Sequence, residues 1–385
     1  MRLNIRLSNF INLRSLKENR ITFHASSIGE LNAFYPLIKE AFNFSKVNIS
    51  VFTKTGYFHA NKIFEEEKKK GLVNIYSFPI LNTFSFLTKQ KAIFIYENDF
   101  WPQMFYFASK KDIPIFIFDL RISKRHLKKY KKLKFFYLFL FKKAKKIFVP
   151  KKEVLDYLIH LFFEIKDKFS YHIPLKLFKF LYFEDDKLKI FINLKKKLKN
   201  KFFLFASLHD EEAFLLEKAI NILQRKNIKI LISPRHPENI KNILKILEKY
   251  KEKNKFFIPN KENFLKNPLK FLNSYSILLF PYFGIQKYLY AFSDYIFVGG
   301  SFNNKGGHDI LEPSYFEKIV FIGPSYENQI GNIDFVENIY ILENEKDFEN
   351  KLLNLKNLKK ATIKEKDKIK RDTLRETLKK CLKQK

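Results

Sequence analysis

Short apolar runs alternate with longer amphipathic stretches from one end of the chain to the other. Runs rich in Ile, Phe and Val predict β-strands, and stretches whose apolar positions recur every three or four residues predict helices. The strands expected in the first half are residues 21–25, 47–53, 73–78, 92–96, 113–118 and 146–149. Those expected in the second half are residues 202–206, 228–232, 275–280, 295–298, 319–322 and 339–342. Such alternation is typical of parallel sheets covered by helices.

Two such sheets are expected, because 385 residues exceed the usual size of one domain. Residues 163–200 are Lys-rich, irregular in pattern and interrupted by Pro174, so we expect the linker there. We predict an α/β protein with two Rossmann-like lobes facing a central cleft, an N-terminal lobe of residues 1–172 and a C-terminal lobe of residues 173–385. Ligands of open parallel sheets bind beyond the carboxyl ends of the strands, so residues that follow strands are the first site candidates.

The formal net charge is +33, which would attract nucleic acid, anionic lipid headgroups or acidic small molecules. Lys, Phe, Ile and Asn are all abundant, so we interpret most lysines as solvated surface. No helix-turn-helix, zinc or RNA-binding signature accompanies the charge, and we expect no nucleic-acid partner. A basic nucleic-acid-binding protein remains the remote alternative.

Cysteine content and the amino end bear on the compartment. The single cysteine, Cys381, cannot form an internal disulfide, which fits a reducing cytoplasm. Residues 1–20 mix apolar positions with arginines and read as neither a signal peptide nor a membrane span. We therefore expect no membrane-crossing segment.

Unusual residues follow three strands of the first half. Residues 24–30 read His-Ala-Ser-Ser-Ile-Gly-Glu, where small residues allow a sharp turn and set Glu30 at a helix start. Taken alone, Glu30 is best interpreted as a carboxylate that complements the helix dipole. Residues 97–102 read Glu-Asn-Asp-Phe-Trp-Pro, and residues 119–123 read Asp-Leu-Arg-Ile-Ser.

Similar segments follow the strands of the second half. Residues 206–212 read Ala-Ser-Leu-His-Asp-Glu-Glu, and residues 234–238 read Pro-Arg-His-Pro-Glu. Val-Gly-Gly-Ser at 298–301 and Gly-Gly-His-Asp-Ile-Leu-Glu-Pro at 306–313 precede Gly-Pro at 323–324. Gly-rich turns and helix starts can offer backbone N–H groups to a phosphate. Arg235 suits bidentate phosphate binding, with a surface ion pair as its alternative.

In this order, and along nearly the whole chain, these segments resemble motifs of the 3-deoxy-D-manno-octulosonic acid (Kdo) transferases. The family patterns are His-Ala-x-Ser-x-Gly-Glu, Glu-Thr-Glu-Leu-Trp-Pro, Asn-Ala-Arg-Leu-Ser, Ala-Ser-Thr-His-Glu-Gly-Glu-Glu, Pro-Arg-His-Pro-Glu, Val-Gly-Gly-Ser and Gly-Gly-His-Asn-Pro-Leu-Glu-Pro. This chain departs from them with Asp99 for the second Glu, with Leu208 for Thr and with one residue missing before Glu211.

The resemblance implies a GT-B glycosyltransferase with an acceptor-binding first lobe and a nucleotide-binding second lobe. Its reaction would be the inverting transfer of Kdo from CMP-Kdo to a lipid A precursor, lipid IVA. The runner-up is a GT-B transferase that uses another nucleotide sugar, because the fold is shared more widely than the sugar choice.

The resemblance also implies catalytic roles. Glu30 matches the family's catalytic base, and Glu97 would orient the acceptor or steady the oxocarbenium-like centre, with helix capping as its alternative. Lys176 lies in a loose match to the family's Gly-Asn-Leu-Lys-Phe-Asp and would stabilise the leaving phosphate, with a solvated lysine as its alternative. The expected acceptor-side residues are Ser27, Gly29, Asp99 and Arg121.

Contacts to the CMP of the donor are expected from the second lobe. Glu312 would accept hydrogen bonds from the ribose hydroxyls, and at Ile285 the family has Glu, so a contact there must come from the backbone. The expected donor-binding residues are Pro234, Arg235, His236, Phe283, Gly284, Ile285, Gly300, Ser301, His308, Asp309, Ile310, Leu311 and Glu312. The histidines lack zinc spacing, and we expect neither a metal nor a cofactor.

One basic segment is mixed with aromatic residues. In residues 124–146 a Lys-rich run leads into Phe-Phe-Tyr-Leu-Phe-Leu-Phe at 135–141 and then Lys142 and Lys143. This pattern suits a helix that lies on an anionic membrane surface, and equally a core helix with a basic outer face. We expect a peripheral protein at the cytoplasmic face of the inner membrane, with residues 1–20 as the second candidate for docking.

Overall fold

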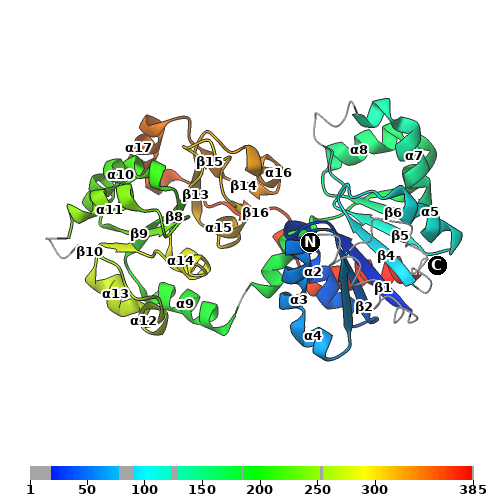
Figure 1. The fold of residues 1–385 in the computed structure, drawn as a ribbon. Helices are drawn as coiled ribbons and strands as arrows, with labels where there is room; N and C mark the ends of the chain where they lie inside the picture. Colours follow the sequence, from blue (N-terminus) through cyan, green and yellow to red (C-terminus); the bar gives the residue numbers. More distant parts are fainter. Residues whose placement is uncertain (1–18, 78–89, 123–128, 184, 252–254, 384–385) are drawn as a thin grey trace. The chain divides into compact units, whose positions relative to one another are not determined.

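The computed structural model describes residues 19–77, 90–122, 129–183, 185–251 and 255–383. Contacts divide the chain into two compact units (Figure 1). Unit 1 comprises residues 1–183 with 367–385, and unit 2 comprises residues 184–366. The sequence placed a boundary after residue 172, whereas the contacts put residues 173–183 and the last helix with unit 1.

Unit 1 is built on a seven-stranded parallel sheet in the order β3-β2-β1-β4-β5-β6-β7. Its strands are β1 (Arg20–Ala25), β2 (Val47–Val51), β3 (Val73–Ser77), β4 (Gln90–Tyr96), β5 (Ile115–Phe118), β6 (Ala144–Val149) and β7 (Phe169–Tyr171). Its helices are α2 (Ile28–Ala41), α3 (Lys54–Ile63), α4 (Glu65–Lys69), α5 (Pro102–Lys110), α7 (Lys134–Lys143), α8 (Lys152–Leu161) and α18 (Arg371–Lys383). The strand order reverses between β1 and β4, which is where open α/β sheets bind ligands.

Phenylalanines fill the middle of this sheet. Phe23 on β1 is in register with Phe94 on β4, which is in register with Phe116 on β5. Their rings stack at centroid distances of 4.9 and 5.3 Å, and all three side chains are buried. Every residue of β1, β2 and β5 is buried, so helices must cover both faces of the sheet.

The boundary between the two units, after residue 183, lies within residues 163–200, where the linker was expected, but most of this segment forms regular structure. Its first part forms η3 (Phe163–Lys168), strand β7 and η4 (Leu175–Tyr182), a 3₁₀ helix that buries Leu175, Leu177 and Phe178. Apolar residues spaced by two and three positions suit the three residues per turn of a 3₁₀ helix. Neither a strand nor an α-helix has this period, so the segment looked irregular.

A buried carboxylate ties the last helix to unit 1. Glu40 of α2 accepts hydrogen bonds from Arg375 Nε of α18 at 2.6 Å and from Tyr182 Oη of η4 at 2.8 Å. Residues more than three hundred positions apart in the sequence therefore share one polar contact. The residue types around Glu40 did not indicate this long-range contact.

Unit 2 contains a second seven-stranded parallel sheet in the order β10-β11-β9-β8-β12-β13-β15. Its strands are β8 (Lys201–Leu208), β9 (Ile228–Pro234), β10 (Phe256–Phe257), β11 (Ile277–Leu279), β12 (Tyr295–Val298), β13 (Ile319–Ile322) and β15 (Ile339–Ile341), and a separate antiparallel pair joins β14 (Val336–Glu337) to β16 (Thr362–Ile363). Its helices are α9 (Asp186–Lys197), α10 (Phe214–Arg225), α11 (Lys241–Glu248), α12 (Lys261–Lys266), α13 (Pro268–Ser274), α14 (Gln286–Phe292), α15 (Leu311–Tyr315), α16 (Ile330–Ile333) and α17 (Glu345–Leu353), with η5 (Asp210–Glu212), η6 (Glu327–Gln329) and η7 (Leu355–Asn357), while η8 (Lys366–Lys368) lies at the boundary. Here the order reverses between β8 and β12.

The pattern-based prediction of two Rossmann-like lobes is confirmed. Every strand predicted from the apolar runs is present, with shifted ends. The strands that the pattern missed, β7, β10, β14 and β16, have only two or three residues, too few to show a period. No helix in the described part of the chain is both long and apolar enough to span a bilayer.

Candidate functional site

Glu30 lies just beyond the carboxyl end of β1, in the first turn of α2. Ser27 caps this helix by accepting a hydrogen bond from Glu30 N at 3.4 Å. The Glu30 carboxylate turns back and accepts from Ser26 N at 2.5 Å. Burial raises the pKa of Glu30, the bond from Ser26 opposes this, and the nearby charges of Asp99 and Glu97 raise it further. Ser27 is therefore the helix cap, and Glu30 is a carboxylate with a raised pKa that holds the preceding turn.

Asp99, which follows β4, is held by three side chains. His24 Nε2 lies 2.6 Å from Asp99 Oδ2, Trp101 Nε1 donates to Oδ1 at 2.8 Å, and the Ser26 hydroxyl also donates to Oδ2. Burial alone would raise the pKa of Asp99, but these contacts outweigh burial and lower it. Ser26 thus joins two carboxylates whose surroundings push their pKa values in opposite directions, an arrangement typical of acid–base sites.

Glu97 and Arg121 connect the ends of β4 and β5. Glu97 has a φ of 52°, a left-handed conformation that is costly for a residue other than glycine. Its Oε1 lies 3.2 Å from Arg121 Nε, and Asn98 Nδ2 donates to Arg121 O at 2.7 Å. Glu30, Asp99, Glu97 and Arg121 therefore lie beyond the carboxyl ends of β1, β4 and β5, and the strand order of unit 1 reverses between the first two of these strands. Gly29 sits in the first turn of α2, between Ser27 and Glu30.

Lys176 is positioned through a buried aspartate to which the sequence analysis assigned no role. Asp119 follows β5 and accepts hydrogen bonds from Tyr96 Oη at 3.0 Å and from Leu175 N at 2.9 Å. Lys176 is the second residue of η4, so Asp119 fixes the start of its helix. Burial raises the pKa of Asp119 to about 6, although Arg121 and both hydrogen bonds lower it. The presence of Asp where the family has Asn was the available signal.

In unit 2 the structure corrects the predicted phosphate-binding turn. The backbone N–H groups of Gly300, Ser301 and Phe302 donate to the Glu212 carboxylate at 2.8, 2.9 and 2.8 Å. Glu212 is fully buried and also accepts from His209 N at 3.1 Å. A protein carboxylate therefore occupies the anion-binding turn between β8 and β12, and these N–H groups are not available to a phosphate.

Three histidines gather beside this turn. The rings of His209 and His308 stack at 5.1 Å with an interplanar angle of 3°, and their Nε2 atoms lie 2.8 Å apart. One ring must therefore donate and the other accept. Burial, together with the charges of Arg235, His209 and His236, lowers the pKa of His308 to about 4. Gly300 is required here, because a Cβ would lie 3.0 Å from the His308 ring and its φ is 75°.

A cavity of about 410 Å³ opens next to these rings. Its lining residues are His209, Asp210, Glu211, His236, Glu238, Asn239 and Lys305. Of the predicted donor-binding residues, His236 alone belongs to this lining. Among the residues that the sequence analysis did not select, His209 and Lys305 are the main additions, and the match of His209 to the family's Ala-Ser-Thr-His pattern was a signal for it.

The other predicted donor residues surround the same edge of the sheet. Arg235 and Phe283 are exposed, Pro234 is buried at the end of β9, and Gly284 has a φ of 75°. Asp309 Oδ1 caps α15 by accepting from Leu311 N at 2.8 Å, and both Asp309 and Glu312 act on buried Tyr290, raising its pKa further beyond the effect of burial.

Four predicted donor residues point into the core. Their side chains are buried, and the Ser301 hydroxyl donates to Val298 O and accepts from Gly323 N, both at 2.8 Å. These residues are Ile285, Ser301, Ile310 and Leu311. As the sequence suggested for Ile285, they could reach a ligand only through the backbone.

Comparison with known proteins relates the chain to one group of enzymes. A family model for 3-deoxy-D-manno-octulosonic-acid transferases matches residues 2–176. The Kdo transferase of Aquifex aeolicus is 26% identical over 369 residues, which cover 92% of this chain and 91% of the relative. That of Rickettsia prowazekii is 28% identical and covers 90% of this chain and 74% of the relative. Over most of its length, the chain is therefore similar to Kdo transferases, which are glycosyltransferases.

Two further proteins delimit this similarity. A bifunctional glycosyltransferase/methyltransferase of Fusobacterium nucleatum is 29% identical over 90% of this chain, which spans only 57% of that protein. The structure of the UDP-GlcNAc 2-epimerase from Neisseria meningitidis superimposes with a TM-score of 0.53 and 10% identity. The match covers 96% of this chain and 100% of the epimerase chain. The second likeness supports the GT-B fold alone.

The Glu212 contacts predict a strong and local effect on stability. Glu212→Gln turns an amide NH₂ toward backbone donors, so we expect it to lower the free energy of unfolding by roughly 2 to 5 kcal/mol. Glu211→Gln, one residue away and exposed, should change it by less than about 0.5 kcal/mol. Urea unfolding of both variants measures this, and equal stabilities would show that the Glu212 hydrogen bonds do not hold the turn.

Asp119 predicts a dependence of stability on pH. The pKa of folded Asp119 is about 6, against an ordinary value of 3.8, so between these values the folded state binds more protons and stability falls as the pH rises. Asp119→Asn should remove this loss and raise the unfolding free energy at pH 7 by roughly 1 to 3 kcal/mol. Urea unfolding from pH 4 to 8 measures it, with the exposed Asp156→Asn as the control. A variant that follows the wild-type pH profile would contradict the burial of a charge at Asp119.

Proposed function

We propose that the protein transfers Kdo from CMP-Kdo to a hydroxyl group of a lipid A precursor, lipid IVA, with inversion at the transferred carbon. The observation that supports it best is the position of Glu30, beside charged Asp99 at the point where the strand order of unit 1 reverses. A direct displacement needs one base near the acceptor hydroxyl. A carboxylate with a raised pKa suits that role.

The chemical step follows from the groups of unit 1. The acceptor oxygen attacks the anomeric carbon of Kdo, the bond from that carbon to the CMP phosphate breaks, and Glu30 takes the hydroxyl proton. The ammonium group of Lys176 stabilises the negative charge that develops on the leaving CMP. Glu97, held by Arg121, orients the acceptor, while Asp99 acts through Ser26 to keep Glu30 in place.

Side chains at the carboxyl edge of the unit 2 sheet bind the donor in this proposal. Since Glu212 occupies the N–H groups of the Gly-rich turn, the phosphate and carboxylate of CMP-Kdo must be bound mainly by cations. Arg235 is exposed at the end of β9, and Lys305 lines the neighbouring cavity. Glu312 would accept hydrogen bonds from the ribose hydroxyls.

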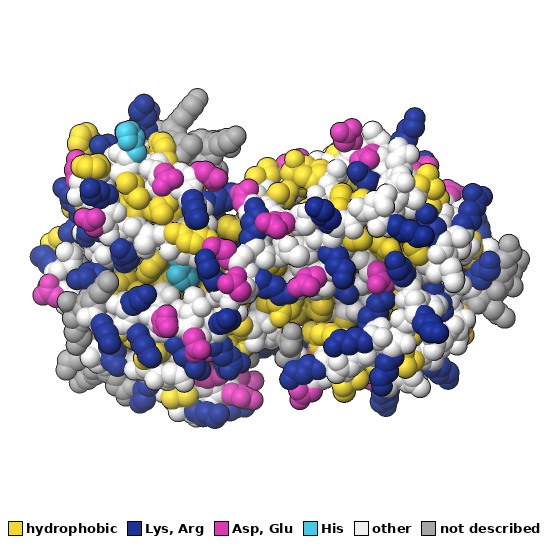
Figure 2. Space-filling model, turned by 180° about the vertical axis from the view of Figure 1, so that it is seen from behind, with side chains coloured by type: hydrophobic (Ala, Val, Ile, Leu, Met, Phe, Trp, Pro, Cys, Tyr) yellow, Lys and Arg dark blue, Asp and Glu magenta, His cyan; other side chains and the backbone are white. Residues whose placement is uncertain are grey.

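The acceptor is a lipid, so we place the protein on the cytoplasmic face of the inner membrane. In support, α7 is buried on one side and exposes Phe135 and Phe139 on the other, with exposed fractions of 85% and 50%. The buried side of α7 agrees with a core helix, and its exposed phenylalanines support the proposed membrane surface. Residues 124–128 and 1–18, which belong to the two candidate docking segments, lie outside the described part. On the face shown in Figure 2, Lys and Arg are spread over both units rather than gathered in one stripe. This spread of charge supports the proposal that the protein has no nucleic-acid partner.

Loss of the base should abolish transfer and leave donor binding intact. Glu30→Gln keeps an oxygen for Ser26 N but cannot take a proton, so we expect transfer to fall by roughly 100-fold or more. Glu66→Gln, exposed on α4, is the matched control. Mass spectrometry of the product from CMP-Kdo and lipid IVA measures the transfer rate. If Glu30→Gln transfers at the wild-type rate, Glu30 has only a structural role at the start of α2.

The same variant should change the pH profile. Burial raises the pKa of Glu30, so wild-type transfer should decline as the pH falls through a value above the ordinary 4.5. Residual transfer by Glu30→Gln should lack this acid limb. An identical limb in both proteins would assign it to another group.

Donor binding should depend on unit 2. Arg235→Ala and Glu312→Ala should each weaken CMP binding by about 1.5 to 3 kcal/mol, the cost of a lost charged hydrogen bond. Arg225→Ala, exposed at the end of α10, should not. Titration calorimetry with CMP, and with UDP to test for another nucleotide sugar, measures it. Unchanged CMP affinity in both variants would place the donor elsewhere.

A further inference from the structure

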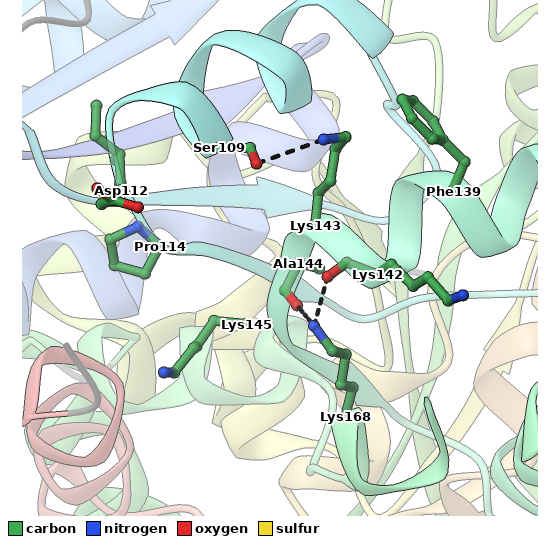
Figure 3. Close-up of a pocket in the computed structure, with 10 residues that line it drawn as sticks. Ser109, Asp112, Pro114, Phe139, Lys142, Lys143, Ala144, Lys145 and Lys168 are labelled. Atoms are coloured by element: carbon green, nitrogen blue, oxygen red, sulfur yellow. Dashed lines mark hydrogen bonds between the residues drawn. The ribbon is translucent and has the colours of Figure 1, made fainter. Parts of the chain in front are cut away.

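A second cavity, of about 580 Å³, lies in unit 1, at the edge of its sheet opposite to the catalytic candidates (Figure 3). It lies at the amino ends of β5 and β6, whereas Glu30 and Asp99 follow the carboxyl ends of β1 and β4 in the same parallel sheet. The lining residues are Ser109, Asp112, Ile113, Pro114, Phe139, Lys142, Lys143, Ala144, Lys145 and Lys168. Nothing in the proposed transfer uses this cavity.

Four lysines and one aspartate surround it. Among the described residues, none of these lysines forms an ion pair with a carboxylate, and with Asp112 as the one acid the lining carries a net positive charge. Lys168 Nζ donates to Lys142 O and Ala144 O, both at 2.6 Å, which fixes a cation at the end of α7. Burial lowers the pKa of Lys168, and the charge of Lys145 adds to this effect. The cavity therefore favours an anion.

One exposed phenylalanine lines the cavity, and two more lie on α7 and η3, the elements that supply three of its lysines. Phe139 lies in the lining, and Lys143 Nζ lies 5.0 Å from its ring centre. Phe135 lies one turn earlier on α7, and Phe163 on η3 has Lys166 Nζ 4.5 Å from its ring. Aromatic rings flanked by cations are typical of protein surfaces that enter the headgroup region of a membrane. A soluble anion would leave these rings without a partner.

We propose that this cavity binds the phosphate of an anionic phospholipid headgroup while Phe135, Phe139 and Phe163 enter the boundary of the bilayer. The inference rests on the proposed action at a membrane and adds a defined headgroup site to it. Because α7 connects the end of β5 with the start of β6, one helix runs between the catalytic edge and the cavity edge of the sheet. A bilayer along α7 would reach both edges.

Vesicle sedimentation tests the charge of the cavity. The probes are phosphatidylcholine vesicles with and without phosphatidylglycerol. Lys142→Ala with Lys145→Ala removes two exposed ammonium groups. The binding of phosphatidylglycerol vesicles should fall by about 30-fold, since each basic residue near an anionic surface contributes about fivefold. Lys196→Ala with Lys197→Ala, exposed on α9, is the matched control and should bind like wild type.

A second pair of variants distinguishes the cavity from diffuse surface charge. Ser109→Glu places a carboxylate beside Lys143, whereas Ser274→Glu makes the same charge change on exposed α13. Ser109→Glu should weaken vesicle binding about fivefold, the effect of one charge near the surface, and Ser274→Glu should not. Thermal unfolding checks that each variant folds.

Equal effects within either pair of variants would overturn the headgroup site, as would equal binding to neutral vesicles. Sedimentation needs neither CMP-Kdo nor an acceptor. The transferase proposal is tested separately, by product formation in detergent with wild-type protein. The two experiments therefore show which of the two proposals is wrong.

Discussion

Burial of each parallel sheet on both faces is the constraint on which the rest of the structure depends. Strands such as β1 and β5 have no solvent-facing side, so polar and charged side chains can follow the strands but cannot lie within them without a partner. The reversal of strand order then separates the loops after β1 and β4, and after β8 and β12, and leaves space there for a ligand. Glu30, Asp99 and the histidines of unit 2 lie at these two places.

Carboxylates at these edges serve two different purposes. Glu212, Asp119 and Asp99 accept several hydrogen bonds each and fix loops or side chains in one arrangement. Glu30 accepts one hydrogen bond from a backbone N–H group, and burial raises its pKa. Burial raises the pKa of Asp119 as well, but Asp119 is fully enclosed by Tyr96 and the start of η4, whereas Glu30 is only half-buried. Glu30 is therefore the more accessible of these two acids, and Asp99 helps to position it through Ser26.

The two edges of the unit 1 sheet differ in chemistry. Acids and Arg121 gather at the carboxyl edge, whereas lysines gather at the amino edge, around the larger cavity. Helix α7 joins them and exposes phenylalanines along its length. This division would let one unit hold the reacting groups and a membrane-facing surface without bringing the lysines of the cavity close to Glu30.

From the sequence alone, the two Rossmann-like lobes and the strand-end positions of Glu30, Asp99, Arg121 and His308 could be predicted, because apolar period and short motifs are local properties. Only the tertiary structure decided which partners those residues have. The sequence around Gly300 predicted a phosphate-binding turn, but its N–H groups donate to Glu212, almost ninety residues earlier in the chain. Asp119 and Glu40 likewise act through contacts with η4 and α18 that no local pattern encodes. Hydrogen bonds between distant segments depend on how the chain packs, and packing is a property of the whole fold.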